Sequence, residues 1–327
     1  MMAAMKPARR FTATVLLGSF FLALAAFIYV RIKGIPAGTA VPLAAAFLVE
    51  FPFYLLPGFR IGFELRRPVV LAVPLAASSV LPYLIYSVPT GQFHPIGFVL
   101  LIAIALALSF WFAILPQHPA TDLLFLAFAA AVYISKVFEI IFTSPVPKLQ
   151  MSVLGHAMLI RTCAIAILAI RGLRPGEALD YRFLPTAREC LVGLKWFAAL
   201  VPACGLALYA TQLGVAPHPA KNAWLVLPEF LGIFWFVALS EEFAFRGLLQ
   251  QWFEKWTHSA TAGLVIGFVL FGAAHLGFNR IFPNWRFAIV AGVFGLFCGL
   301  AWRQTRTIQS AMVTHALGAT LYRVFFQ

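Results

Sequence analysis

The chain has 327 residues, of which 62% are hydrophobic and only 11% are charged. Soluble domains contain about 45–50% apolar and about 25% charged residues, and the mean hydropathy of this chain is +0.91. This composition excludes an ordinary soluble enzyme, a disordered protein and a secreted disulfide scaffold. A membrane-spanning helix needs about 20 apolar residues. The length therefore predicts an all-α, polytopic transmembrane helix bundle of about ten spans, within a range of about 9–11.

The net charge of +13 does not indicate a nucleic-acid partner. Lys and Arg stand singly or in pairs between apolar runs, as topology signals in short loops do. The four cysteines, Cys163, Cys190, Cys204 and Cys298, show no CxxC spacing. We therefore expect neither disulfides nor a cysteine metal cluster.

Apolar segments follow one another along the whole chain. The first follows a basic N-terminal stretch and has no small-residue cleavage site, which favours a signal anchor over a cleaved signal peptide. One or two of the segments are expected to be short, re-entrant or interfacial. The candidate spans are residues 11–30, 39–59, 69–88, 96–115, 121–143, 151–170, 190–213, 223–250, 259–278, 286–303 and 308–326.

A more polar connector, residues 171–189, separates two groups of spans. We expect an N-terminal region of about six spans over residues 1–189 and a C-terminal core over residues 190–327. Lys and Arg are more numerous in the segments on the side of the N-terminus, which predicts a cytoplasmic N-terminus. The expected location is a plasma membrane, such as a bacterial cell membrane, with membrane lipid as a partner.

Ionisable residues inside spans are costly, so each is a candidate for function. In the first half these residues are Glu50, Lys136, Glu139, His156 and Arg161. Lys136 and Glu139 stand three residues apart and can neutralise each other on one helix face. We favour a structural role for all five.

In the second half, the segment FVALSEEFAFRGLLQ places Glu241 and Glu242 together, with Arg246 close behind them. Residues four apart share a helix face, whereas neighbours point about 100° apart. Glu242 and Arg246 are therefore expected to pair, and Glu241 to point elsewhere without a counter-ion. A carboxylate without an adjacent cation in a low-dielectric site is a candidate general base.

Two later spans each contain a histidine. The segment GLVIGFVLFGAAHLGFN has Phe271 and His275 four residues apart, and IQSAMVTHALGATLYR contains His315. A rise of ~1.5 Å per residue from the expected turns places Glu241 and both histidines at similar depths in the membrane. The span between the histidines is rich in glycine, which predicts close helix packing. The three side chains can therefore meet in one cavity.

The ordered set of EExxxR, FxxxH, a glycine-rich span and a final histidine-bearing helix resembles the CPBP family. That family comprises CAAX proteases and bacteriocin-processing proteins, and is also called the Abi or glutamic intramembrane protease group. The resemblance covers roughly residues 190–327. It implies a glutamate-activated water that attacks a peptide bond within the membrane, without a cofactor or a metal ion.

The resemblance also implies roles for individual residues. Glu241 would be the base, His275 would help to position the water, and His315 would help to stabilise the oxyanion. Four further residues would support them: Glu242, Arg246, Phe271 and Asn279.

The chain departs from the family pattern at one position. The family's last motif is HxxxN or HxxxD, and the fourth residue after His315 is Ala319. An Asn there would donate a hydrogen bond to the oxyanion, and the loss of one such donor costs about 10²–10³ in rate. Asn279, Thr314 and Thr320 are the candidates to replace it.

Three functions stay open from the sequence. The first is an endopeptidase that cleaves a membrane-associated protein or peptide, of which a prenylated CAAX protein is one option. The second is a catalytically inactive immunity or scaffold protein, which Ala319 favours. The third is a zinc-dependent protease that uses two Glu and two His, although the sequence lacks HExxH. A cysteine-nucleophile transpeptidase has no recognisable motif to support it.

Overall fold

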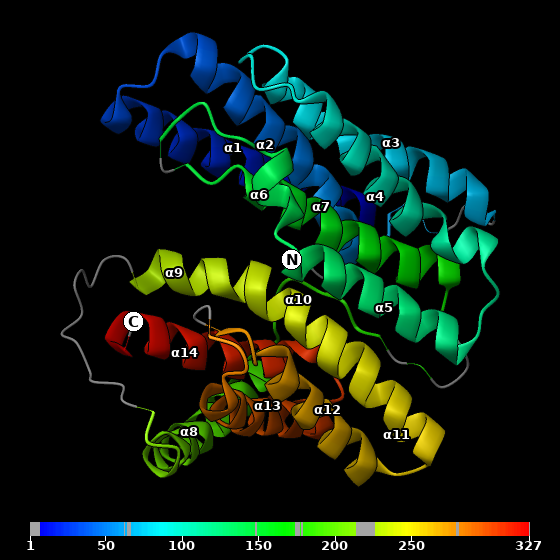
Figure 1. Cartoon of the computed structure of the whole chain (residues 1–327), viewed down its shortest axis with the longest axis vertical. Helices are drawn as coiled ribbons and strands as arrows, with labels where there is room; N and C mark the ends of the chain where they lie inside the picture. Colours follow the sequence, from blue (N-terminus) through cyan, green and yellow to red (C-terminus); the bar gives the residue numbers. More distant parts are fainter. Residues whose placement is uncertain are drawn as a thin grey trace. The chain divides into compact units, whose positions relative to one another are not determined.

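In the computed structural model, the regular elements of the described residues are helices (Figure 1). Contacts between residues divide the chain into two units, Met1–Arg174 and Pro175–Gln327, each with its own core. Every regular element in the described part of the chain is helical, which confirms the predicted all-α class. The described residues are 7–61, 63, 67–147, 149–173, 177, 179–213, 226–278 and 281–326.

The described residues of the first unit form seven α-helices, and the last of them continues as a π-helical segment. Proline is the first residue of α3, α4 and α5, where its missing N–H is not needed. The elements are α1 (Pro7–Lys33), α2 (Ala37–Phe59), α3 (Pro68–Ser87), α4 (Pro95–Ile114), α5 (Pro119–Ile134), α6 (Val137–Ile141), α7 (Ser152–Ile165) and η2 (Ala166–Arg171).

The predicted span 121–143 is not continuous. Helix α5 ends at Ile134, and Lys136 has a positive φ of 56° that interrupts the helical path before α6. The prediction that Lys136 and Glu139 share one helix face is therefore wrong. Among the described contacts, no ion pair joins these two residues.

Two buried ion pairs lie within the first unit. Arg161 Nε is 2.6 Å from Glu50 Oε1, and both side chains are nearly inaccessible. Arg171 binds Asp122 through two hydrogen bonds of 2.9 and 3.0 Å. A buried charge must be paired because its desolvation is costly. The interpretation of Glu50 and Arg161 as structural residues is consistent with this partnership, which joins α2 to α7.

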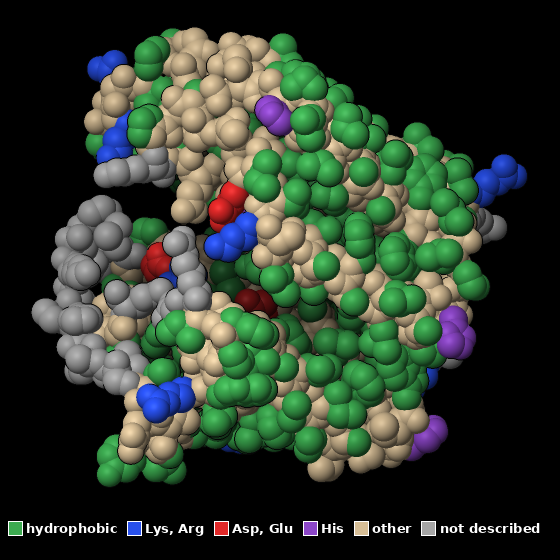
Figure 2. Space-filling view, in the orientation of Figure 1, with side chains coloured by type: hydrophobic (Ala, Val, Ile, Leu, Met, Phe, Trp, Pro, Cys, Tyr) green, Lys and Arg blue, Asp and Glu red, His purple; other side chains and the backbone are tan. Residues whose placement is uncertain are grey.

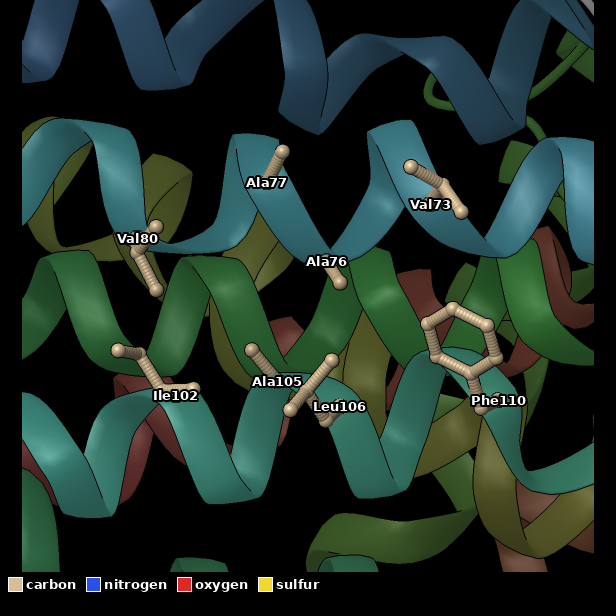
Figure 3. A pocket seen from close by; sticks show the side chains of 8 residues that line it. All are labelled: Val73, Ala76, Ala77, Val80, Ile102, Ala105, Leu106 and Phe110. Carbon is tan, nitrogen blue, oxygen red and sulfur yellow. The ribbon is translucent and has the colours of Figure 1, made fainter.

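A shallow apolar groove with a volume of ≈ 250 Å³ lies between α3 and α4 (Figure 3). Its lining carries no ionisable side chain, so it has no acid–base chemistry. The lining residues are Val73, Ala76, Ala77, Val80, Ile102, Ala105, Leu106 and Phe110.

The second unit contains α8 and four later helical segments. One helical path runs from Val226 to Thr257 and includes two π-helical stretches. The elements are α8 (Ala187–Ala210), α9 (Val226–Gly232), η4 (Ile233–Ala238), α10 (Leu239–Glu242), η5 (Phe243–Gln250), α11 (Gln251–Thr257), α12 (Ala260–Ala274), α13 (Trp285–Thr305) and α14 (Ile308–Phe326).

Specific residues set the ends of these helices. Thr186 and Glu189 form a reciprocal capping box at the start of α8, which satisfies N–H groups that a helix start leaves unpaired. Ser259 and Asn284 cap α12 and α13 through their side-chain oxygens. His258 adopts a left-handed conformation at the end of α11.

Within the described part of the chain, seven helices are long and apolar enough to span a membrane, by length and composition. Helices α5 and α12 are apolar but have only 16 and 15 residues. The sequence analysis predicts that one or two apolar segments are short. Hydrophobic side chains cover much of the face seen in Figure 2, which suits lipid contact. The chain is a multi-pass membrane protein.

Candidate active site

The path α10–η5 carries the glutamate pair and its arginine. Arg246 Nη1 donates to Glu242 Oε1 at 3.0 Å, and both side chains are buried. This is the predicted ion pair, which follows from the spacing of four residues. Glu241 lies in a different environment, because its side chain is 25% exposed.

The glycines of α13 let this path approach closely. Arg246 Nη2 donates to the carbonyl oxygen of Gly295 at 2.7 Å. One turn later, Gln250 Nε2 lies 3.4 Å from the carbonyl oxygen of Gly299. A Cβ atom at Gly299 would lie 2.8 Å from Gln250 Oε1 and 2.5 Å from a methyl carbon of Leu264. Glycine is therefore required where these side chains reach the backbone of α13.

Helix α14 brings His315 to both glutamates. His315 Nδ1 lies 2.6 Å from Glu242 Oε1, and Nε2 lies 3.9 Å from Glu241 Oε2. The His315 side chain is 5% exposed. Oε2 of Glu241 is buried and has no hydrogen-bond partner among the described residues. One imidazole thus faces two carboxylates, of which one is bonded to it and the other is not.

His275 lies at the C-terminal end of α12 and not inside a span as predicted. The helix ends at Ala274, and His275 is its C-cap residue. His275 Nδ1 is 2.8 Å from the carbonyl oxygen of Phe271. Since the helix ends here, residues after His275 do not continue its face.

Phe271 connects the two histidines. The centroid of its ring lies 4.7 Å from that of His275 and 5.9 Å from that of His315. The Arg246 guanidinium stacks over the same ring at 4.6 Å, a distance at which a cation–π interaction is favourable. Phe271 therefore contacts a residue of each motif, and only 2% of it is exposed.

Comparison with known families adds to this geometry. Residues 223–321 match the family described as type II CAAX prenyl endopeptidase Rce1-like. This region belongs to the CAAX protease family. The match spans less than a third of the chain but includes Glu241, Glu242, Arg246, His275 and His315. No curated protein and no solved structure matches the chain.

The CAAX protease region lacks a polar side chain at Ala319, and the proposed replacements differ in their contacts. Thr314 Oγ1 lies within hydrogen-bond distance of the carbonyl oxygens of Gly193 and Ser310, so its single proton is already used inside the helix packing. Thr320 Oγ1 is buried and has no partner among the described residues. Asn279 lies outside the described residues.

Cys298 is a neighbour of the CAAX protease site that the sequence did not single out. One ligand atom each of Glu242, Cys298 and His315 lies within 4.8 Å of the others, and all three residues are buried. Among the described residues, this is the group whose ligand atoms lie close enough to hold a metal ion. Its one Glu, one Cys and one His differ from the two Glu and two His that the zinc hypothesis requires. The Arg246 guanidinium on the Glu242 carboxylate opposes a cation there, because like charges repel strongly in a low-dielectric site. The one signal in the sequence is that Cys298 stands three residues after Gly295 in the glycine-rich span. Gly295 is the residue whose carbonyl oxygen binds Arg246.

Proposed function

We propose that the second unit is an intramembrane endopeptidase in which Glu241 activates a water molecule. Membership of residues 223–321 in the CAAX protease family supports the hydrolysis of a peptide bond. The observation that carries the choice of base is that no hydrogen bond among the described residues reaches the Glu241 carboxylate, whose Oε2 lies 3.9 Å from His315 Nε2. By contrast, Glu242 Oε1 is engaged by Arg246 and His315.

The chemistry requires one base that can also return the proton. The Glu241 carboxylate accepts a proton from water while the water oxygen bonds to the peptide carbonyl carbon. When the tetrahedral intermediate collapses, the carbon–nitrogen bond breaks and the proton from Glu241 passes to the leaving amine. The ion pair of Glu242 and Arg246 holds the helix that carries this base against α13. No step requires a metal ion or a cofactor.

The substrate proposed is an extended segment of a membrane-associated protein or peptide. The description of the matching family names a CAAX prenyl endopeptidase, so a prenylated C-terminal peptide is the first substrate to test. We expect the protein to lie in a plasma membrane with its N-terminus in the cytoplasm. The excess of Lys and Arg on that side supports this orientation.

The test is cleavage of quenched fluorescent peptides, with and without a prenyl group, by the full chain in detergent. We expect Glu241→Gln to lower kcat by about 10²–10⁴, the usual contribution of a general base. Glu229→Gln is the matched control, because Glu229 is 38% exposed in an ion pair with Arg323, and a surface pair of this kind contributes little. Full activity of Glu241→Gln would contradict the proposal.

Two further outcomes of the same assay favour the alternatives. Cleavage that is lost on adding a chelator would indicate a metal-dependent protease. No turnover of any peptide by the wild-type chain would favour an inactive immunity or scaffold protein, in agreement with the missing donor at Ala319.

A further inference from the structure

We infer that Glu242 is a positioning residue that holds His315 with an unprotonated Nε2, so that His315 and Glu241 together bind the attacking water. The inference rests on the proposed function. It gives His315 a role different from the oxyanion contact that the family resemblance implies. It also explains why α10 contains two adjacent glutamates, Glu241 and Glu242, that have different partners.

The proton on His315 follows from the atoms that face it. A carboxylate oxygen is only an acceptor, so Nδ1 of His315 must donate its proton to Glu242 Oε1 across 2.6 Å. A neutral imidazole carries one N–H, which leaves a lone pair on Nε2. That nitrogen is the one that lies 3.9 Å from Glu241 Oε2.

Arg246 allows His315 to stay neutral in this arrangement. Its guanidinium, which is always protonated, donates to the same Oε1 of Glu242 at 3.0 Å. The buried carboxylate therefore has its counter-ion without a charged imidazole. Arg246 is fixed in turn by its hydrogen bond to the carbonyl oxygen of Gly295.

Aromatic rings hold the imidazole in this orientation. Phe294 packs against His315 with a centroid distance of 5.0 Å and an angle of 82°, and Phe271 does so at 5.9 Å and 79°. Gly318 makes room for Phe294, because a Cβ atom there would lie 2.6 Å from the ring. The imidazole can therefore turn little about its own axis.

The 3.9 Å between the two acceptors is a distance that one water molecule can bridge at an angle, once it enters between them. A water oxygen at ~2.8 Å from both His315 Nε2 and Glu241 Oε2 sees them roughly 90° apart, close to the angle between its two O–H bonds. Both hydrogens then point at acceptors, and a lone pair is left for the peptide carbon. The proton that is lost goes to Glu241. His315 in this state cannot donate from Nε2 to an oxyanion.

The first experiment measures the tautomer directly. The full chain, labelled with ¹⁵N at its seven histidines, is studied in detergent by long-range proton–nitrogen correlation, and His315→Gln assigns the signal. We expect a neutral ring protonated at Nδ1. A ring protonated at Nε2, or at both nitrogens, at neutral pH would overturn the inference. The measurement needs no turnover, so it stands even if the proposed function fails.

The second experiment separates positioning from folding. Glu242→Met combined with Arg246→Met replaces a buried ion pair by apolar side chains of similar length, an exchange that often keeps stability. We expect a melting temperature within about 4 °C of the wild type, a KM within about threefold, and a kcat lower by about 10²–10⁴. A folded double variant that keeps its kcat within about threefold would refute the positioning role. Wild-type and Glu241→Gln samples in the same assay report separately on the proposed function.

Discussion

The substitution Gly295→Ala tests whether the glycine of α13 sets the position of Phe271. A Cβ atom at residue 295 would lie 3.0 Å from Phe271 Cβ and 3.1 Å from two ring carbons. Carbon contacts are optimal at about 3.5–4.0 Å, so Phe271 must move by roughly 0.5–1 Å. Overpacking of this kind costs about 1–3 kcal/mol. The displaced ring also contacts His275 and His315, and a misplacement near 1 Å lowers kcat by up to about 10².

Gly292→Ala is the matched control on the same helix. A Cβ atom there would meet its nearest neighbour, the carbonyl oxygen of Phe268, at 3.7 Å, which is an ordinary contact. Both variants gain about 1 kcal/mol of helix propensity, so the difference between them isolates the clash. Thermal unfolding in detergent and peptide cleavage are measured side by side. Equal stability and equal kcat for the two variants would refute the reasoning.

Three further substitutions test other parts of the structure. Ala319→Asn adds the donor that the family pattern contains, and we expect kcat to rise by up to about 10²; an unchanged kcat would show that this residue does not reach the oxyanion. Arg161→Met leaves Glu50 buried without its cation and should lower the free energy of unfolding by about 3–5 kcal/mol, with much of the loss recovered when Glu50→Met is added. Thermal unfolding of the single and the double variant checks this prediction. An Arg161→Met variant as stable as the wild type would contradict it. Because His315 is assigned to the water, His275 is the imidazole left to stabilise the oxyanion, and His275→Ala should then lower kcat by about 10²–10³. Activity as high as in the wild type would exclude that role.

Much of the fold could be predicted because its signals are local. The apolar runs predicted most helix bounds to within a few residues, as for α3 and α4. The expected spans leave turns at residues 251–258 and 304–307, and these contain the left-handed residues His258 and Arg306. The interruption at Lys136 was missed because hydropathy carries no information about φ.

The parts of the site that could be predicted are those within one helix. The pair of Glu242 and Arg246 follows from a spacing of four residues, whereas the bond from His315 to Glu242 joins positions 73 residues apart. The pair of Glu50 and Arg161, 111 residues apart, was beyond reach for the same reason. No periodicity links residues on different helices, so these contacts depend on packing that only the folded chain shows.

The two adjacent glutamates obtain different tasks from their surroundings and not from their own chemistry. Neighbours on a helix diverge by about 100°, so one side chain turns towards Arg246 and α13 while the other does not. Glu242 is fully buried and Glu241 is 25% exposed. The short α10 also lies between two π-helical stretches, a feature found often at functional sites because it re-aims side chains. Glu242, whose Oε1 already binds Arg246 and His315, is suited to orient a neighbour, and Glu241, which no hydrogen bond among the described residues engages, is suited to accept a proton. Of the two glutamates, Glu241 is therefore the base, and Glu242 is the residue that positions His315 beside it.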